Sequence, residues 1–340
     1  MSLGASRVFR RGPQSSTSPR NDATIVGTDG LLATDTERGF DAESLFKHGY
    51  EVLQAVMKAH AELGVLIVAF DPKGRPMAQG WLRASLDKTR AAIVGRHSAC
   101  DLALSSAERD VSLRHLMVIV RATSHSEVRI RILDLHTARG FTDEHGEVLS
   151  AAVADGPLFI GLDGVRLVAL VTGEPLLSQA EHAYAAIPPR VLFEEHKGTV
   201  GQIRRPGGAQ PSFESLGQTI IRSIDGPVAA ASELRGEDEM QEGTLIIRGA
   251  RTMLRRAVGP RALARGILVG RYDRCAVGID TRRLSRVHFL IVRDGDDIVG
   301  IDTASTNGTW LGEREVSLIR LEDGLSLSLA QALQITWHCD

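Results

Sequence analysis

The sequence lacks the features that mark secreted, zinc-binding or membrane-spanning proteins. Among 340 residues there are only three cysteines, Cys100, Cys275 and Cys339, which cannot all pair, and no CxxC or Cys/His ligand spacing occurs. The first twenty residues lack the apolar centre of a secretion signal, and no apolar run approaches the length of a transmembrane helix. We therefore expect reduced thiols, no metal, no other cofactor, no membrane association and a cytoplasmic location.

An excess of charge of either sign is also missing. Lysine and arginine number 40 against 42 aspartates and glutamates, which gives a formal net charge of −2. General electrostatic attraction to nucleic acid is not expected, so any anion recognition must be local. No GxxxxGK[ST] loop, HExxH pair, GxSxG elbow or kinase signature set occurs, so we expect no catalytic activity.

Composition and periodicity divide the chain into five segments. Residues 1–40 are rich in Gly, Ser, Thr and Asp and predict a flexible tail, while apolar residues at helical spacing predict a short helix over 41–63. Residues 64–172 and 244–340 contain short alternating apolar runs between turns, which predict β-strands. The Pro-, Gly- and acid-rich stretch 173–243 predicts a long irregular linker between them.

The two β-rich segments resemble each other, which indicates an internal repeat. Three motifs recur in the same order, and an aspartate-glycine pair precedes the last apolar run of each segment. The pairs are Ile93-Val-Gly-Arg96 with Leu268-Val-Gly-Arg271, Ser112-Leu-Arg-His115 with Ser285-Arg-Val-His288, and Asp134-Leu-His-Thr-Ala-Arg-Gly140 with Asp302-Thr-Ala-Ser-Thr-Asn-Gly308.

Gly-Arg, then Ser-Arg-x-His, then Ser-Thr-Asn-Gly-Thr, in this order and spacing, resembles the forkhead-associated domain. Residues 244–340 match at every position, and 64–172 look like a divergent tandem copy. The resemblance implies an all-β protein of two eleven-stranded β-sandwiches, each made of two packed sheets, with ligand-binding loops at one end. The alternating runs between turns agree with that fold independently.

The resemblance further implies that residues 244–340 bind phosphothreonine peptides. Arg271 and Ser285 would hold the phosphate, and Thr306 and Asn307 would bind the peptide. A phosphate brings about −1.5 to −2 charge and three acceptor oxygens, which suit a guanidinium fork and a hydroxyl donor. Arg286 follows on the same loop, where it either contacts the phosphate or is an ordinary solvated arginine.

Gly270, His288 and Gly308 are expected to maintain loop geometry. Glycine permits backbone conformations that are closed to other residues, and a buried histidine can join two loops. Direct contact between His288 and the ligand is the alternative to this structural role.

The first copy departs from the pattern at the positions that matter for binding. Arg96 and Ser112 are retained, and Arg114 lies nearby. Leu113, however, replaces the arginine after the serine, and Arg139 stands at the asparagine position, where it has no acceptor to offer a peptide backbone. The copy is therefore either a degenerate scaffold or docking module, or an altered phosphate binder.

These expectations describe an adaptor whose partners are Thr-phosphorylated substrates of a Ser/Thr kinase. The alternative is a structural assembly protein in which both sandwiches bind partners independently of phosphate. Four threonines of the tail have acidic neighbours and are candidate phosphorylation sites, through which the protein could associate with itself; the alternative is an unmodified tail. They are Thr24, Thr28, Thr34 and Thr36.

Overall fold

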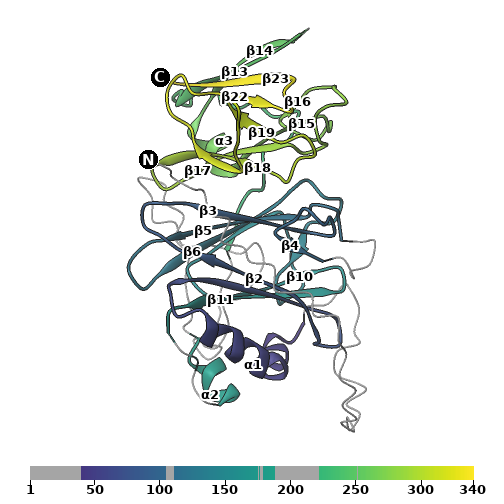
Figure 1. Ribbon diagram of the computed structural model, residues 1–340, viewed down its shortest axis with the longest axis vertical. Helices are drawn as coiled ribbons and strands as arrows, with labels where there is room; N and C mark the ends of the chain where they lie inside the picture. The colour runs from purple at the N-terminus through teal and green to yellow at the C-terminus, as the bar shows by residue number, and fades with distance from the viewer. Residues whose placement is uncertain (1–39, 105–110, 175, 177–178, 188–221, 251) are drawn as a thin grey trace.

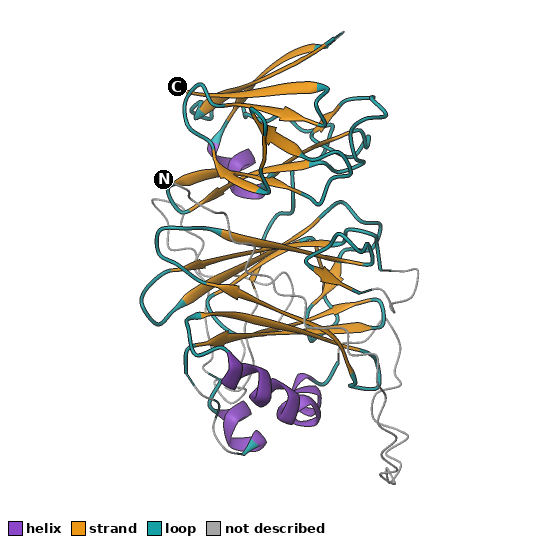
Figure 2. Ribbon diagram, in the orientation of Figure 1, coloured by secondary structure: helices purple, strands orange, loops and turns teal. Residues whose placement is uncertain are grey.

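The computed structural model describes residues 40–104, 111–174, 176, 179–187, 222–250 and 252–340. The described residues form four β-sheets stacked one upon another, with two helices against the outer face of the first sheet (Figures 1 and 2). The candidate phosphorylation sites at residues 24, 28, 34 and 36 lie outside the described residues. None of the helices described is both long and apolar enough to cross a membrane.

Each half of the β-structure contributes eleven strands of the described chain, which confirms the predicted all-β fold. The first sandwich consists of β1 Gly64–Phe70, β2 Pro76–Arg83, β3 Arg90–Gly95, β4 Leu102–Ala103, β5 Leu116–Ala122, β6 Val128–Asp134, β7 Phe141–Thr142, β8 Val148–Leu149, β9 Ala151–Ala154, β10 Leu158–Leu162 and β11 Val165–Thr172. The second consists of β13 Gly243–Gly249, β14 Met253–Val258, β15 Ile267–Gly270, β16 Val277–Gly278, β17 Phe289–Asp294, β18 Asp297–Asp302, β19 Thr309–Leu311, β20 Arg314–Glu315, β21 Leu318–Arg320, β22 Ser326–Leu329 and β23 Leu333–Cys339. The remaining elements are α1 Ala42–Ala59, α2 Ala180–Ala185, β12 Arg222–Ser223 and α3 Pro260–Arg265.

The two sandwiches share one topology. The first has the strand orders β2-β1-β11-β10-β7-β8 and β4-β3-β5-β6-β9, and the second has β14-β13-β23-β22-β19-β20 and β16-β15-β17-β18-β21. In each sandwich one short pair is parallel, β3 with β4 and β15 with β16. The strand β12 extends the first sandwich at β9. The repeat detected in the sequence is therefore a repeat of structure.

Apolar alternation explains how each sandwich closes on its core. In β6, Val128, Ile130 and Ile132 are buried in the core of the first sandwich, while Arg129 and Arg131 between them are only partly buried. Strand β1 is apolar throughout because both its faces are covered: one faces this core and the other faces the helices.

Helix α1 covers the outer face of the first sheet. Its N terminus is capped by Asp41, whose Oδ1 accepts a hydrogen bond from the backbone N–H of Ser44 at 3.0 Å. The fully buried Phe46 packs against Phe159 and Tyr184, which ties the helix to both the sheet and α2. The helix ends at Ala59, four residues before the predicted end of the segment at 63.

The described parts of the predicted linker pack against both sandwiches. Helix α2 contributes Ala183 and Tyr184 to the cluster beneath α1, and Val228 and Leu234 are buried in the core of the second sandwich. These residues carry no periodic pattern in the sequence, so composition alone predicted an irregular linker here. The boundaries 173–243 stay a prediction.

The two sandwiches are joined by one apolar cluster between the sheet β3-β5-β6-β9 and the sheet β15-β17-β18. Its fully buried members include Met117 and Leu133 from the first sandwich and Leu268, Leu290 and Val292 from the second. Figure 1 shows the two sheets lying face to face. We call this cluster the inter-sandwich interface.

Polar contacts at the rim show that the sandwiches are aligned. Arg114, just before β5, donates to the carbonyl oxygen of Ala304, just after β18, and β18 ends opposite the start of β17. Arg121, near the end of β5, donates to the carbonyl oxygen of Asp294 at the end of β17, at 2.6 Å. Strands β5 and β17 therefore run in the same direction, and both sandwiches present β4 or β16 at the same end of the stack (Figure 1).

A buried carboxyl group in the first sandwich predicts a pH-dependent stability. The Glu144 side chain is 4% exposed, and neither of its oxygens has a hydrogen-bond partner among the described residues. Burial raises the pKa of Glu144 from 4.5 to about 7, and Asp143 adds to the increase. Between these values the unfolded chain ionises while the folded chain stays protonated, so stability is lost as pH rises through that window.

We expect Glu144→Gln to be as stable as the parent below about pH 4.5 and more stable by about 2 kcal/mol at pH 8. Urea unfolding across this pH range measures the difference. The control is Glu147→Gln, which removes an exposed carboxylate from the same loop. A Glu144→Gln effect that is constant with pH would contradict the assignment.

Candidate functional site

Three loops of the second sandwich meet at the shared loop end of the stack. They follow β15, precede β17 and follow β18, and they carry Arg271, Ser285 with Arg286, and Thr306 with Asn307. The backbone N–H of Arg271 donates to the carbonyl oxygen of Ser285 at 3.1 Å, and that of Thr306 donates to Ser285 Oγ at 3.0 Å. The structure thus brings together the five residues that the sequence predicts to bind a phosphopeptide.

The polar groups of the middle and last loops are held in place. Ser285 is 7% exposed, and its hydroxyl lies 3.4 Å from Thr306 Oγ1 in addition to accepting the Thr306 N–H. Asn307 donates from Nδ2 to the carbonyl oxygen of Arg283 at 2.7 Å, which fixes the exposed amide. Asn307 is exposed, and its Oδ1 accepts no hydrogen bond from the described residues, so this acceptor is unused.

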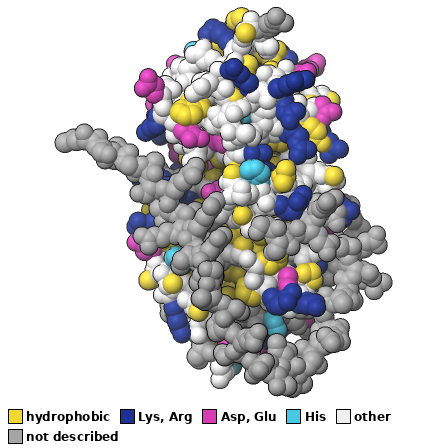
Figure 3. Space-filling model, turned by 45° about the vertical axis from the view of Figure 1, so that its right-hand side comes forward, with side chains coloured by type: hydrophobic (Ala, Val, Ile, Leu, Met, Phe, Trp, Pro, Cys, Tyr) yellow, Lys and Arg dark blue, Asp and Glu magenta, His cyan; other side chains and the backbone are white. Residues whose placement is uncertain are grey.

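The two arginines of this site are unpaired among the described residues. Arg271 and Arg286 are both exposed, and neither guanidinium makes a hydrogen bond or ion pair with another described residue. Figure 3, in which the loop end has been turned forward, shows many Lys and Arg side chains on the upper part of the molecule. An anion that reached the site would therefore find free donors and no competing carboxylate bound to them.

A fully buried histidine holds the loops beneath the site. His288 accepts the backbone N–H of Ser285 at Nδ1, at 3.2 Å, and its Nε2 lies 3.1 Å from the carbonyl oxygen of Gly308. Burial lowers the pKa of His288, which favours the neutral ring with its proton on Nε2. With no exposed surface, His288 is placed to support the loops rather than to contact a ligand.

The two predicted glycines occupy positions that a side chain would disturb. Gly308 has φ +71°, a left-handed conformation, and a Cβ there would lie 2.7 Å from Glu315 Oε1. A Cβ on Gly270 would overlap the carbonyl oxygen of Arg286. Both glycines therefore permit close approach between the loops.

The family model of the FHA domain matches residues 267–330, a range that spans all three loops. The second sandwich contains an FHA domain. Comparison with curated proteins found no match. FHA domains are non-catalytic interaction modules, and the match covers only this part of the chain.

Several solved structures, FHA domains among them, resemble the chain over somewhat less than a third of its length. The first FHA domain of Rv1747 from Mycobacterium tuberculosis is 26% identical, with 28% of this chain and 98% of that chain covered and a TM-score of 0.24. The Slr1951 protein from Synechocystis is 20% identical, with 30% of this chain and 98% of that chain covered and a TM-score of 0.27. The FhaA FHA domain was solved in complex with the intracellular domain of Rv3910. It is 21% identical, with 28% of this chain and 99% of that chain covered and a TM-score of 0.24. At these TM-scores, the assignment rests on the family match and the loop residues.

The first sandwich keeps the loop architecture of the FHA domain. His115 accepts the Ser112 N–H at Nδ1, at 3.1 Å, and its Nε2 lies 2.7 Å from the carbonyl oxygen of Gly140. The backbone N–H of Thr137 donates to Asp134 at 2.9 Å. These contacts match those that His288 and Asp302 make in the second sandwich.

The binding groups of the first sandwich are arranged differently. Arg96 donates from Nε to the carbonyl oxygen of Val111, and Arg139 forms an ion pair with Asp163 at 3.1 Å. Arg114 points to the second sandwich, where it bonds Ala304. Four residues are predicted as a second site. The three arginines among them, Arg96, Arg114 and Arg139, have their guanidinium groups bound to protein atoms; the fourth residue is Ser112.

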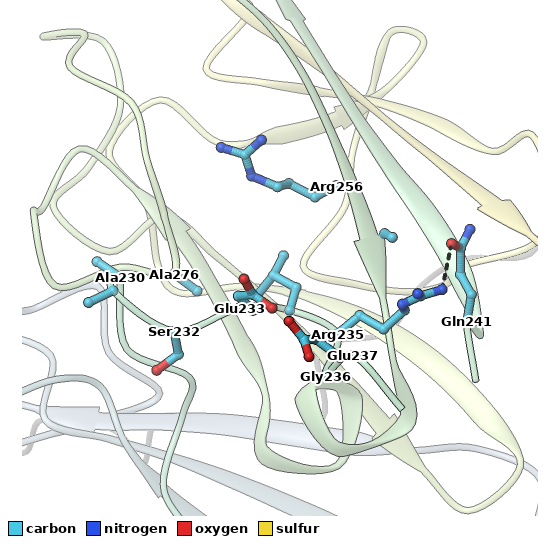
Figure 4. A pocket seen from close by; sticks show the side chains of 12 residues that line it. Ala230, Ser232, Glu233, Arg235, Gly236, Glu237, Gln241, Arg256 and Ala276 are labelled. Atoms are coloured by element: carbon cyan, nitrogen blue, oxygen red, sulfur yellow. Dashed lines mark hydrogen bonds between the residues drawn. The ribbon is translucent and has the colours of Figure 1, made fainter. Parts of the chain in front are cut away.

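A hollow adjoins Arg271 on the side of β14. It has a volume of 420 Å³ and shares Ala230 and Arg256 with a neighbouring hollow of 630 Å³. Figure 4 shows Arg256 on one side of the larger hollow and Glu233 and Glu237 across from it. These residues form no motif in the sequence, so spacing alone predicts no site here. With charges of both signs, the hollow does not by itself predict an anionic ligand.

Proposed function

We propose that this protein is a phosphothreonine-dependent adaptor, whose FHA domain binds Thr-phosphorylated partners through Arg271, Ser285, Thr306 and Asn307, with Arg286 beside them. The observation that carries the proposal is the pair of exposed arginines, Arg271 and Arg286, whose guanidinium groups have no partner among the described residues, next to a hydroxyl held by the neighbouring loop. A phosphate would accept from both guanidinium groups, and Asn307 Oδ1 would accept from the peptide backbone.

The other parts of the molecule complete the proposal. The first sandwich serves as a scaffold, because its arginines are already bound to protein atoms. The partners are substrates of a Ser/Thr kinase, met in the cytoplasm, and the protein is neither a catalyst nor a nucleic-acid binder. A phosphorylated copy of its own N-terminal tail is one such ligand.

The test is calorimetric titration of the full chain with peptides chosen from an oriented phosphothreonine library. The series includes peptides centred on Thr24, Thr28, Thr34 and Thr36. Each peptide is compared with its unphosphorylated and phosphoserine forms. We expect the phosphate to strengthen binding by about 100-fold, because charge-assisted hydrogen bonds contribute about 1.5–3 kcal/mol each.

Phosphatase treatment of a captured partner separates this proposal from constitutive assembly. Release of the partner supports the adaptor. Retained binding after complete dephosphorylation, or equal affinity for phosphorylated and unphosphorylated peptides, would overturn it in favour of a phosphate-independent assembly protein.

A further inference from the structure

An arginine of the first sandwich reaches into the loop that carries Thr306 and Asn307. We infer that Arg114 is a positioning residue of the FHA pocket, so that the divergent copy shapes recognition in its neighbour. This inference rests on the proposed function in assigning a ligand to the pocket, but its structural part concerns the free protein.

The contact is a charge-assisted hydrogen bond in a sheltered place. Arg114 is partly buried and donates from Nη2 to the carbonyl oxygen of Ala304. Its Nε is buried without a hydrogen-bond partner among the described residues, so burying this side chain carries a desolvation cost. A bond from a charged donor of this kind is stronger than one between neutral groups and fixes its acceptor more firmly.

The backbone conformation of Ala304 determines where the following residues of the loop lie. It has φ 56°, a left-handed conformation that is uncommon outside glycine. On its C-terminal side, Ser305 bonds to Asp302 through both N–H and hydroxyl, at 2.7 Å each, and Thr306 N–H reaches Ser285 Oγ. A shift at Ala304 would therefore move the residues that form the pocket.

The repeat shows that this contact is not a consequence of symmetric packing. The residue that corresponds to Arg114 in the FHA domain is Val287, an apolar member of the inter-sandwich interface. The residue that corresponds to Ala304 is His136, also left-handed with φ 57°, and its Nε2 lies 3.4 Å from the carbonyl oxygen of Val228. An arginine therefore reaches the loop after β18 of the FHA domain, whereas the corresponding loop of the first sandwich is bonded through its own His136 to Val228.

The charge of Arg114 also acts on the histidine beneath the pocket. Burial is the main reason that the pKa of His288 is lowered, and the nearby guanidinium of Arg114 lowers it further. A neutral His288 can accept the Ser285 N–H, whereas a protonated ring cannot. Of the groups around the ring, Asp302 and the Gly308 carbonyl oppose this effect and raise the pKa.

A second arginine that bridges the sandwiches, Arg121, offers a matched control. It also bridges the sandwiches, with hydrogen bonds to the carbonyl oxygen of Asp294 at 2.6 Å and to Asp297 at 3.3 Å. These residues lie at the far end of β17, away from the binding loops. Arg114→Met and Arg121→Met each remove one bridging guanidinium, but only the first touches the loop after β18.

The experiment compares these two variants of the full chain by peptide calorimetry, amide hydrogen exchange and NMR titration of His288. We expect Arg114→Met to weaken phosphopeptide binding about tenfold, the loss of roughly one hydrogen bond. It should also speed exchange of the Thr306 amide and raise the pKa of His288. Arg121→Met should leave binding within about twofold of the parent, at a similar loss of stability.

Unchanged Thr306 exchange and His288 titration in Arg114→Met would overturn the inference, as would equal losses of affinity in both variants. A parent chain that binds no phosphothreonine peptide would overturn the proposed function instead. In that case the exchange and titration data still decide whether Arg114 positions the loop.

Discussion

Replacing Arg271 with alanine should reduce phosphothreonine-peptide binding by the full chain at least about 100-fold, while Arg96→Ala should leave binding unchanged. A guanidinium that holds a phosphate through two charge-assisted bonds contributes about 3 kcal/mol or more. The Arg271 guanidinium has no partner among the described residues, so its loss should change the unfolding free energy by less than about 0.5 kcal/mol. Calorimetry and urea unfolding measure the two effects.

Arg96 occupies the corresponding position in the first sandwich and is the matched control. Its Nε donates to the carbonyl oxygen of Val111, so Arg96→Ala should lower the stability of the first sandwich and spare the affinity. Retained binding in Arg271→Ala would contradict the site assignment. A loss of binding in Arg96→Ala would show that the first sandwich is a phosphate binder, which is the alternative to the scaffold.

The sequence predicts the parts of this molecule that depend on local spacing. His288 bonds to both Ser285, three residues before it, and Gly308, twenty residues after it. The motif that holds these loops together can therefore be recognised from residue spacing in the sequence. His115 shows the same relation to Ser112 and Gly140. For this reason two sandwiches could be predicted, although the first lacks several of the binding residues.

The stacking of the sandwiches could not be predicted in the same way. Leu133 and Leu290 face away from their own cores into the inter-sandwich interface, yet in the sequence they look like any residue of a buried strand. An apolar pattern shows that a face is covered and does not show by what. The contact between Arg114 and Ala304 could not be predicted either, because the two residues are 190 positions apart and no local sequence motif marks their contact.

The inter-sandwich interface leads to the largest expected change in stability. Leu133 is fully buried on β6, on the face opposite the core of its own sandwich, and its Cδ1 would lie 3.5 Å from a Cβ at Gly266 of the second sandwich. A carboxylate there would be buried without a partner. We expect Leu133→Asp to destabilise the docked arrangement by about 4 kcal/mol or more, because an unpaired buried charge is among the most damaging of single changes.

The expected outcome is separation rather than general unfolding, since Leu133 takes no part in the core of the first sandwich. Calorimetry should show two transitions in place of one, and small-angle scattering should show a longer particle. Leu86→Asp, which places the same charge at a 43% exposed leucine, should change neither. A single transition at the parent temperature in Leu133→Asp would contradict the interface.

Separation would also remove the hydrogen bond between Arg114 and Ala304. Leu133→Asp should therefore lose phosphopeptide affinity to about the same extent as Arg114→Met, although Leu133 lies outside the pocket. In a variant that carries both changes the losses should not add, because the second change removes a contact that the first has already broken. Additive losses would show that the two residues act on the pocket by separate routes.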